Sequence, residues 1–408
     1  MTVSSSTLRP PVALIENMAW CWWTRPRATR IGGKLFVGAI EAGGGIVAAM
    51  IDLATGAMQR TTLAQFEDDD HNNPALVAEA GRPLICFYSR HDAPEGLRYR
   101  VSEGALDPSA WGDERLLTFG GSTTYAQVHN SGGELHLFTR VDETRWGWRL
   151  SSDWATSWMP ARDFLAFDTD QQVYMATALL ADGRTLRVAV SGHPKEYEQR
   201  PLHDVWACQI DLLTGIVSTS TGTVLGNLRT GENMPLRQSK LDLVQRTPSD
   251  RTVNLFDVSS GKVFEISFVS KINDDRSTRD TRYHVASCRE GAWRTETLVG
   301  AGSKFGYIDA GFYVGGTAFA EHSTGGEVFL SREEAGLWHL QRWTRSDDGR
   351  WAGADLVTPG TTRIVRPWVI APPTAAHGVL ALALEHYPDD DYMDTRSSLV
   401  VAPLKSPS

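Results

Sequence analysis

Short segments that alternate apolar and polar residues recur along the whole chain. They are rich in β-branched and aromatic residues, which is the composition of β-strands. The segments that we expect to form strands span residues 34–41, 46–53, 83–90, 134–141, 185–192, 205–212, 252–258, 263–269, 282–288, 327–333, 338–344, 379–386 and 397–404. The pattern therefore predicts an all-β protein.

Turn-forming clusters separate many of these segments. They combine glycine with Asp, Ser, Thr or Arg and lie at residues 52–57, 211–216, 259–262, 289–293, 323–327 and 347–351. Such clusters reverse the chain direction, so we expect consecutive strands to pair in antiparallel fashion. Helical periodicity is rare, and the one short helical turn that we expect lies near residues 158–166.

A coarse repeat becomes visible when the chain is searched for long periods. Each unit opens with a conspicuous polar or aromatic residue that runs into an apolar strand, and the openings lie near Arg25, His71, Tyr125, Tyr174, Arg237, Tyr307 and Arg366. The openings are 46 to 70 residues apart, which suits four-stranded blades with variable loops. We predict a seven-bladed β-propeller with four-stranded antiparallel blades, formed by residues 1–408 as a single domain. Six or eight blades are the alternatives.

Composition and charge narrow the classes of function. The net charge of −9 gives no general attraction for nucleic acid or for anionic membranes. No apolar run approaches the roughly 20 residues that span a bilayer. The N-terminal segment lacks the pattern of a secretory signal, and the four scattered cysteines fit reduced thiols. We therefore expect a cytoplasmic protein, or a secreted one if a signal has been removed, and a monomer that binds neither nucleic acid nor membrane.

The seven predicted openings carry unusual side chains for one end of a channel. The first strand of each propeller blade faces the central axis, so these residues would form a ring of arginine, tyrosine and histidine at its mouth. A lining chosen for stability alone would favour small or aliphatic residues. This ring is the first indication of a binding or catalytic site.

The segment DDDHNNPAL at residues 68–76 places His71 after three carboxylates, and SRHD places His91 beyond the next predicted strand. Neighbouring carboxylates raise the pKa of an imidazole and fix its tautomer, which suits acid–base catalysis. The alternative is that the polar residues merely cap a loop. Asp and His side chains also bind metals, and a structural calcium or another divalent ion is a further alternative. No zinc motif is present, and we expect no required cofactor.

Arginines near the predicted channel have an obvious use. A guanidinium group binds a carboxylate through two hydrogen bonds, and the neutralised carboxylate acidifies the adjacent carbon. Arg237, Arg363 and Arg366 are the best candidates for this role, and Arg282 is another. The alternative for each single arginine is an ion pair on the surface or between blades.

The segments WCWWTRPRATRIGGKLFVGAIEAGG (residues 20–44), DDDHNNPAL, FYSRHD (87–92) and TRIVRPW (362–368) resemble the BNR-repeat propeller family that includes ulvan lyases and rhamnosyl-glucuronate lyases acting on gum arabic. The resemblance is concentrated in the first hundred residues. The Asp-box of this repeat is represented at best by the distorted SSDWATSW at 151–158, which argues against a sialidase.

This resemblance implies a lyase that cleaves a 4-linked uronic acid, glucuronate or iduronate, by β-elimination. It implies that His71 removes the C5 proton, that His91 assists, and that Tyr125 is a further acid or base. The residues expected to bind the acidic oligosaccharide or polysaccharide are Asn72, Arg90, Tyr174, His193, Arg237, Arg282, Tyr307, Arg363 and Arg366. The sequence does not rank His71 against Tyr125 as the base.

Two other functions remain open at this point. A glycoside hydrolase would use two carboxylates, drawn from Asp68–Asp70 and Asp309, at about 5–9.5 Å from each other. A binding propeller without catalysis would use the same aromatic residues and arginines only to hold an acidic glycan or a protein.

Overall fold

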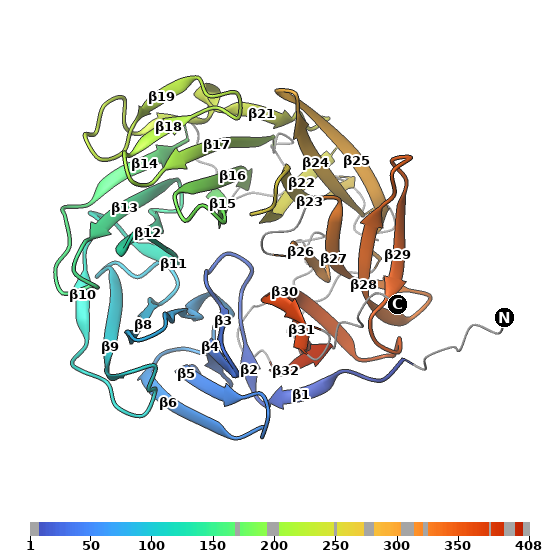
Figure 1. Ribbon diagram of the computed structural model, residues 1–408, viewed down its shortest axis with the longest axis horizontal. Helices are drawn as coiled ribbons and strands as arrows, with labels where there is room; N and C mark the ends of the chain where they lie inside the picture. The colour runs from blue at the N-terminus through green and yellow to red at the C-terminus, as the bar shows by residue number, and fades with distance from the viewer. Residues whose placement is uncertain are drawn as a thin grey trace.

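The structure is a computed structural model, shown in Figure 1. It describes residues 8–167, 172–193, 204–248, 251–272, 281–302, 314–320, 325–374, 377–386 and 396–402, of which residues 193, 272, 371–374 and 377 are described without their side chains. Within these ranges, no helix is long and apolar enough to cross a membrane.

Seven antiparallel sheets are arranged around a central axis, which confirms the predicted seven-bladed β-propeller (Figure 1). The first blade contains β2 (Met18–Ala19), β3 (Ala28–Ile31), β4 (Lys34–Glu41), β5 (Gly45–Asp52) and β6 (Met58–Gln65). The second contains β7 (Ala75–Val77), β8 (Pro83–Tyr88), β9 (Leu97–Ala105) and β10 (Arg115–Leu117), and the short 3₁₀ helix η1 (Asp70–Asn72) precedes it. The third contains β11 (Thr123–Ser131), β12 (Glu134–Val141), β13 (Arg145–Ser151) and β14 (Arg162–Ala166).

The fourth blade is the most elaborate. It contains β15 (Gln172–Leu179), β16 (Thr185–His193), β17 (Val205–Asp211), β18 (Ile216–Ser218) and β19 (Val224–Asn227), and β21 (Asp242–Gln245) also pairs with β17. Between β19 and β21 lie β20 (Leu236–Arg237), which pairs in parallel with β14, and the 3₁₀ helix η2 (Gln238–Lys240). This insertion lengthens the path from the fourth blade to the fifth.

The last three blades close the ring. The fifth contains β22 (Arg251–Val258), β23 (Phe264–Ile272), β24 (Arg282–Arg289) and β25 (Ala292–Gly300), and the sixth contains β26 (Gly316–Ala318), β27 (Glu327–Glu334), β28 (Leu337–Arg345) and β29 (Trp351–Asp355). The seventh contains β30 (Arg363–Thr374), β31 (His377–His386) and β32 (Arg396–Ala402), and β1 (Val12–Ile15) pairs with β32. The N-terminal strand thus completes the blade formed by the C-terminal segment and closes the ring.

Three sequence expectations need correction or fall outside the structure. The predicted opening of the fifth blade near Arg237 is wrong, because Arg237 lies in β20 and the inner strand of that blade is β22. The expected helical turn near 158–166 is also wrong, since most of this segment forms β14. Tyr307, the predicted sixth opening, lies outside the described residues.

The axis of the ring is filled by aromatic side chains from one loop. The loop between β2 and β3, residues 20–27, runs into the centre of the ring (Figure 1). Trp20 Nε1 donates to the carbonyl of Arg366 at 3.2 Å, and Trp23 Nε1 donates to the carbonyl of Leu255 at 3.3 Å. This loop, the axial loop, therefore ties the first blade to the fifth and the seventh.

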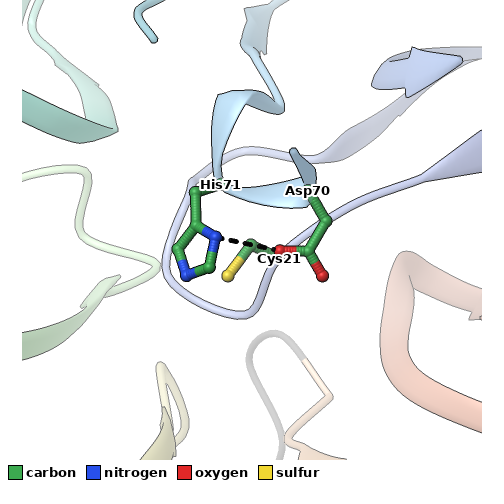
Figure 2. A group of neighbouring side chains, drawn as sticks. All are labelled: Cys21, Asp70 and His71. Atoms are coloured by element: carbon green, nitrogen blue, oxygen red, sulfur yellow. Dashed lines mark ion pairs between the residues drawn. The ribbon is translucent and has the colours of Figure 1, made fainter. Parts of the chain in front are cut away.

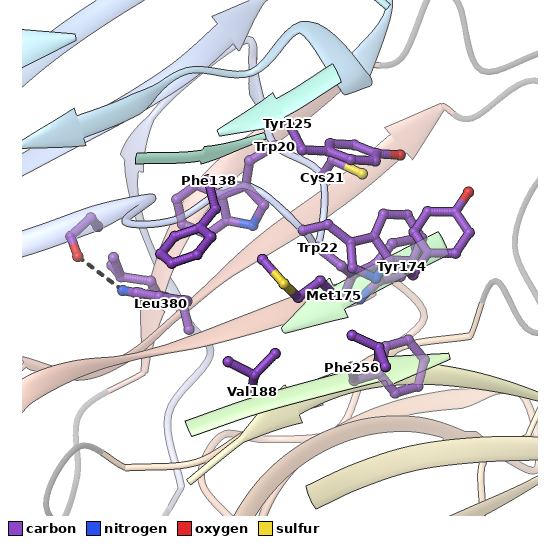
Figure 3. Packing of buried hydrophobic residues seen from close by; sticks show 14 of the residues in the cluster. Trp20, Cys21, Trp22, Tyr125, Phe138, Tyr174, Met175, Val188, Phe256 and Leu380 are labelled. Atoms are coloured by element: carbon purple, nitrogen blue, oxygen red, sulfur yellow. Dashed lines mark hydrogen bonds between the residues drawn. The ribbon is translucent and has the colours of Figure 1, made fainter. Parts of the chain in front are cut away.

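The axial loop packs against the inner strands through large rings. Trp23 lies 4.0 Å from Tyr174 and 5.5 Å from Tyr125, and Trp22 lies 5.7 Å from Phe256, all between ring centroids. Figure 3 shows Trp22 among Tyr125, Tyr174 and Phe256. Buried aromatic rings contribute large apolar areas to a core, so much of the high tryptophan content serves to fill the channel.

Candidate active site

The acidic segment before β7 folds back on itself to form η1. Asp69 is its N-cap: Asp69 Oδ1 accepts from the backbone N–H of His71 at 2.8 Å, and the Asp69 carbonyl accepts from Asn72 N–H at 3.0 Å. Asn73 Oδ1 then accepts from the backbone N–H of Cys21 at 2.8 Å. The polar residues ahead of the strand therefore form a cap that is fastened to the axial loop.

The two predicted histidines come together on one carboxylate. His71 Nδ1 lies 2.6 Å from Asp69 Oδ1, and His91 Nδ1 lies 3.1 Å from Asp69 Oδ2. The two imidazole rings stack with centroids 4.2 Å apart and planes 3° apart. Because both Nδ1 atoms face Asp69, both Nε2 atoms lie on the side turned away from it. The His91 side chain is 19% exposed and that of His71 only 4%.

The shared carboxylate pushes the two histidines toward different protonation states. Burial lowers the pKa of His71, but the charge and hydrogen bond of Asp69 outweigh it and raise the pKa above its ordinary value. Burial lowers the pKa of His91, and the neighbouring His71 lowers it further. Burial raises the pKa of Asp69, yet the two imidazoles hold it well below the usual range. At a pH between the pKa values of the two histidines, the cluster therefore holds one imidazolium, one neutral imidazole and one carboxylate.

Asp70 connects the histidines to the seventh blade. Asp70 Oδ1 lies 3.2 Å from His71 Nδ1, as Figure 2 shows together with the nearby Cys21, and Asp70 Oδ2 lies 2.5 Å from Arg366 Nη1. Arg366 also donates to the Trp20 carbonyl, and its guanidinium lies 4.3 Å from the centroid of the Trp22 ring. Because its charge is already balanced by a buried carboxylate, Arg366 is a structural ion-pair partner rather than an open clamp for a substrate.

Two tyrosines and a second buried arginine stand beside the histidine pair. The Tyr125 ring lies 5.8 Å from His71, and the guanidinium of Arg140 lies 4.7 Å from Tyr125 and 5.5 Å from Tyr174. Burial raises the pKa of Tyr174 to about 12, although Arg140 lowers it. Burial lowers the pKa of Arg140, but the two tyrosines and Asp92 raise it above its ordinary value. Arg140 therefore stays charged beside two phenol groups.

Irregular backbone turns several of these side chains toward the site. Tyr125, Asp92 and Arg366 have φ values of 61°, 50° and 55°, which is the left-handed region that few residues other than glycine adopt. The register of β11 with β12 shifts at Tyr125, and that of β30 with β31 shifts across Arg366. Such bulges re-aim side chains, and strained residues concentrate at functional sites at a cost of about 1–3 kcal/mol each.

The structure brings together only part of the predicted ring. His71, His91, Tyr125, Tyr174 and Arg366 converge at the end of the channel where the inner strands begin. Asn72 is fully buried, and its Nδ2 donates to the Glu67 carbonyl at 3.1 Å. Arg90 is exposed and pairs with Glu67 at 2.8 Å.

The remaining predicted residues lie elsewhere or cannot be placed. Arg237 is exposed, and its Nη1 donates to the Phe167 carbonyl at 3.3 Å, so it lies on the β14–β20 edge. Arg282 and Arg363 are exposed at the first positions of β24 and β30. The side chain of His193 and the whole of Tyr307 are outside the described part of the chain.

Sequence reasoning missed Arg140 and the central role of Asp69. Arg140 ends the segment ELHLFTR of β12, where a fully buried guanidinium donates to Asp92 Oδ1 at 3.3 Å. The strand also contains Glu134, His136 and Thr139, so its sequence alone gives no signal that this arginine is buried beside a partner. Asp69 was recognised only as one of three neighbouring carboxylates, because spacing does not reveal which one faces both histidines.

The donor atoms of this site fit calcium poorly. Among the described residues, Cys21, Asp70 and His71 lie close enough to share an ion, and so do Asp69, His71 and His91. Calcium takes roughly six to eight oxygen ligands, whereas these groups offer nitrogen and sulfur as well. Burial raises the pKa of Cys21 to about 12, with a contribution from Asp70, so this group is a neutral thiol. The contacts are those of hydrogen bonds and ion pairs.

The fold has close structural counterparts. Two solved structures of a PL25 polysaccharide lyase, an ulvan lyase, superimpose with TM-scores of 0.73 over 98% of this chain and 96% of theirs. Their sequence identities to this chain are 13% and 14%, and the first is bound to -[GlcA(1-4)Rha3S]-. No family model and no curated protein sequence matches the chain. At this low identity, the similarity establishes the propeller fold.

Proposed function

We propose that this protein is a polysaccharide or oligosaccharide lyase that cleaves a 4-linked uronic acid by β-elimination. In that reaction a base removes the proton from C5, the C4–O4 bond breaks, a C4=C5 double bond forms, and the departing O4 receives a proton. The reaction needs a base, an acid and a positive group that neutralises the C6 carboxylate. It consumes no water and needs no redox cofactor.

The observation that carries this proposal is the His71–Asp69–His91 cluster. A pair of titratable groups whose pKa values are pushed apart supplies an acid and a base together. His91 is neutral and more exposed, and its Nδ1–H is directed to Asp69, so His91 Nε2 is suited to accept the C5 proton. His71, the protonated partner, is suited to donate to O4, and Tyr125 lies within reach as an alternative donor. This assignment moves the base from His71, as the sequence suggested, to His91.

The stacking of the two rings also favours one stereochemistry. Two parallel imidazoles with centroids 4.2 Å apart present their Nε2 atoms to the same face of a sugar. They would therefore remove H5 and protonate O4 from one side, in a syn elimination. In glucuronate H5 and O4 lie on the same face of the ring, whereas in iduronate they lie on opposite faces. The proposed substrate is therefore a 4-linked glucuronate.

Arg140 is the group best suited to neutralise the carboxylate of the substrate. It is charged and lies beside Tyr125, and its counterion Asp92 is partly exposed at a distance of 3.3 Å. Arg366 is less suited, because Asp70 and Trp22 already enclose it. The ulvan lyase with the same fold, whose bound ligand is -[GlcA(1-4)Rha3S]-, adds support for a substrate that contains glucuronate.

A hydrolase is less consistent with the same residues. Asp69 is held ionised between two imidazoles, Asp70 is paired with Arg366, and Asp68 Oδ2 accepts from the backbone N–H of Gly43 at 2.9 Å. The pKa of Asp69 is lowered, whereas the general acid of a glycosidase needs a raised one. Asp309 lies outside the described residues.

The proposal is tested by incubating the protein with oligosaccharides that contain either 4-linked glucuronate or 4-linked iduronate. The conjugated C4=C5 uronate absorbs in the ultraviolet, so product formation is followed directly. We expect absorbance to rise with the glucuronate substrate and to rise far more slowly with the iduronate one. Binding of both substrates without any absorbance change would instead favour a binding propeller.

A further inference from the structure

A cavity with several polar groups in its wall lies at the other end of the channel from the histidine pair. Its volume is about 430 Å³, within the usual range for small-molecule sites. It is lined by the later residues of the inner strands, such as His129 of β11 and Thr177 of β15, whereas Tyr125 and Tyr174 near the starts of those strands face the first site. Four residues of strand separate Tyr125 from His129, which corresponds to roughly 13 Å. The aromatic rings of the axial loop lie between the two ends.

A chain of hydrogen bonds determines which groups at this cavity donate hydrogen bonds and which accept them. Gln127 Nε2 donates to the carbonyls of Trp23 and Met175 at 2.9 and 2.6 Å, so Gln127 Oε1 must be the acceptor for the Thr177 hydroxyl. Thr177 Oγ1 in turn lies 2.8 Å from His129 Nε2 and accepts a hydrogen bond from its N–H. His129 is therefore the Nε2–H tautomer, which leaves Nδ1 as an acceptor.

The titration of His129 agrees with this tautomer. Burial lowers the pKa of His129 to about 3, and Arg25 and His136 lower it further. The imidazole is therefore neutral throughout the physiological range, and its Nδ1 accepts a hydrogen bond but repels no cation and attracts no anion.

The cavity wall contains an ion pair in which the charge of Asp257 balances the charge of Arg25. Arg25 Nη2 lies 2.5 Å from Asp257 Oδ1, and Arg25 also donates to the carbonyls of Thr177 and Phe256 at 3.1 and 3.3 Å. Asp257 Oδ2 accepts from Phe319 N–H at 2.7 Å. Arg25 Nε is buried and has no hydrogen-bond partner among the described residues. The cavity thus combines donors and acceptors with almost no net charge.

We propose that this cavity is a second binding site, specific for a neutral polyhydroxylated ligand such as a monosaccharide. Hydroxyl groups both donate and accept, which matches His129 Nδ1 as an acceptor and the ion pair of Arg25 and Asp257, while the Thr177 hydroxyl holds His129 in this tautomer. Apolar wall residues, including Val128, Val258 and Val369, suit the C–H faces of a sugar ring. An anionic sugar would gain nothing here, because Asp257 already compensates Arg25. This site differs from the proposed catalytic site, which requires a carboxylate on its ligand.

The test is ligand-observed NMR or calorimetric titration of the full-length protein with D-glucose and with D-glucuronate. We expect glucose to bind, glucuronate to bind more weakly, and His129→Phe to weaken glucose binding about tenfold or more. Thr177→Val, a nearly isosteric change, removes the hydroxyl with less disturbance and is expected to act in the same direction. His91→Gln, at the other end of the channel, should leave glucose binding unchanged.

Two results would overturn this inference. One is the absence of any saturable glucose binding by the wild-type protein, and the other is equal binding by the wild type and both cavity variants. Lyase activity is measured on the same samples. Because the two sites are separate, a wild-type protein that shows lyase activity but binds no glucose would refute only the second site, and a wild-type protein that binds glucose but shows no lyase activity would refute only the proposed catalysis.

Discussion

His71 and His91 lie face to face, with ring planes 3° apart, and both direct Nδ1 to the carboxylate of Asp69. They are twenty positions apart in the sequence, and the strands β7 and β8 lie between them. The shared carboxylate explains why the chain places three acidic residues before an apolar strand: Asp69 orients both imidazoles, and Asp70 ties the cluster to Arg366.

The pH dependence of activity should follow from the opposite shifts of the two histidines. The active form has His91 neutral and His71 protonated. Activity should therefore rise as pH increases through the pKa of His91, which lies below its ordinary value, and fall as pH increases through the pKa of His71, which lies above it. A profile of kcat/KM against pH checks this. A single rising limb with no decline at high pH would show that protonated His71 is not required.

Replacing His91 should remove the base. We expect His91→Gln to lower kcat by about 10²–10⁴-fold and to abolish the acidic limb of the pH profile. The matched control is His339→Gln, which alters another histidine–carboxylate pair, with Asp355 at 3.0 Å in the sixth blade, and should leave kcat unchanged. Activity of His91→Gln within threefold of the wild type would exclude His91 as the base.

The shape of the Arg140 guanidinium group, as well as its charge, should contribute to activity. Arg140→Lys keeps the positive charge but loses the planar group that lies over Tyr125 and contacts Asp92. Because this group is proposed to stabilise the negative charge that develops on the substrate carboxylate, we expect kcat to fall by about tenfold or more, with a smaller change in KM. Arg145→Lys, on the partly exposed start of the neighbouring strand β13, is the control. A change confined to KM would assign Arg140 to binding alone.

The axial loop should contribute strongly to stability. Trp23 is fully buried, packs on Tyr174 and donates to the Leu255 carbonyl. We expect Trp23→Ala to lower the free energy of unfolding by about 3–5 kcal/mol, measured by denaturant unfolding. Trp351→Ala, at a partly exposed position in β29, should cost clearly less. Equal costs for the two variants would show that the axial loop is not a principal part of the core.

The fold and part of the candidate site could be predicted from the sequence. Alternating strands and turn clusters predicted the all-β fold, and the long-period repeat predicted the seven blades. The residues that open the repeat units correctly suggested that His71, Tyr125 and Tyr174 lie together. The same rule failed for Arg25, because the axial loop carries it through the ring to the second cavity. It failed for Arg237, because the insertion after β19 delays the fifth blade. Neither the path of the axial loop nor the insertion after β19 can be recognised from the spacing of residues in the sequence.

Arg140 illustrates a further limit of sequence reasoning. Its strand reads as an ordinary half-buried strand, and only the three-dimensional ring brings it next to Tyr125 and Asp92. Contacts between blades depend on how each sheet twists and how its bulges turn individual residues, and these properties are not encoded in local spacing. The catalytic roles of His71, His91 and Tyr125 remain predictions.

The most direct test of this account is mass spectrometry of the products formed from a 4-linked glucuronate oligosaccharide in ¹⁸O-labelled water. Elimination breaks the C4–O4 bond without adding water, so we predict a fragment with an unsaturated terminal uronate and no ¹⁸O in either newly formed end. Saturated fragments carrying one ¹⁸O atom per cleavage would identify hydrolysis and contradict the proposed mechanism.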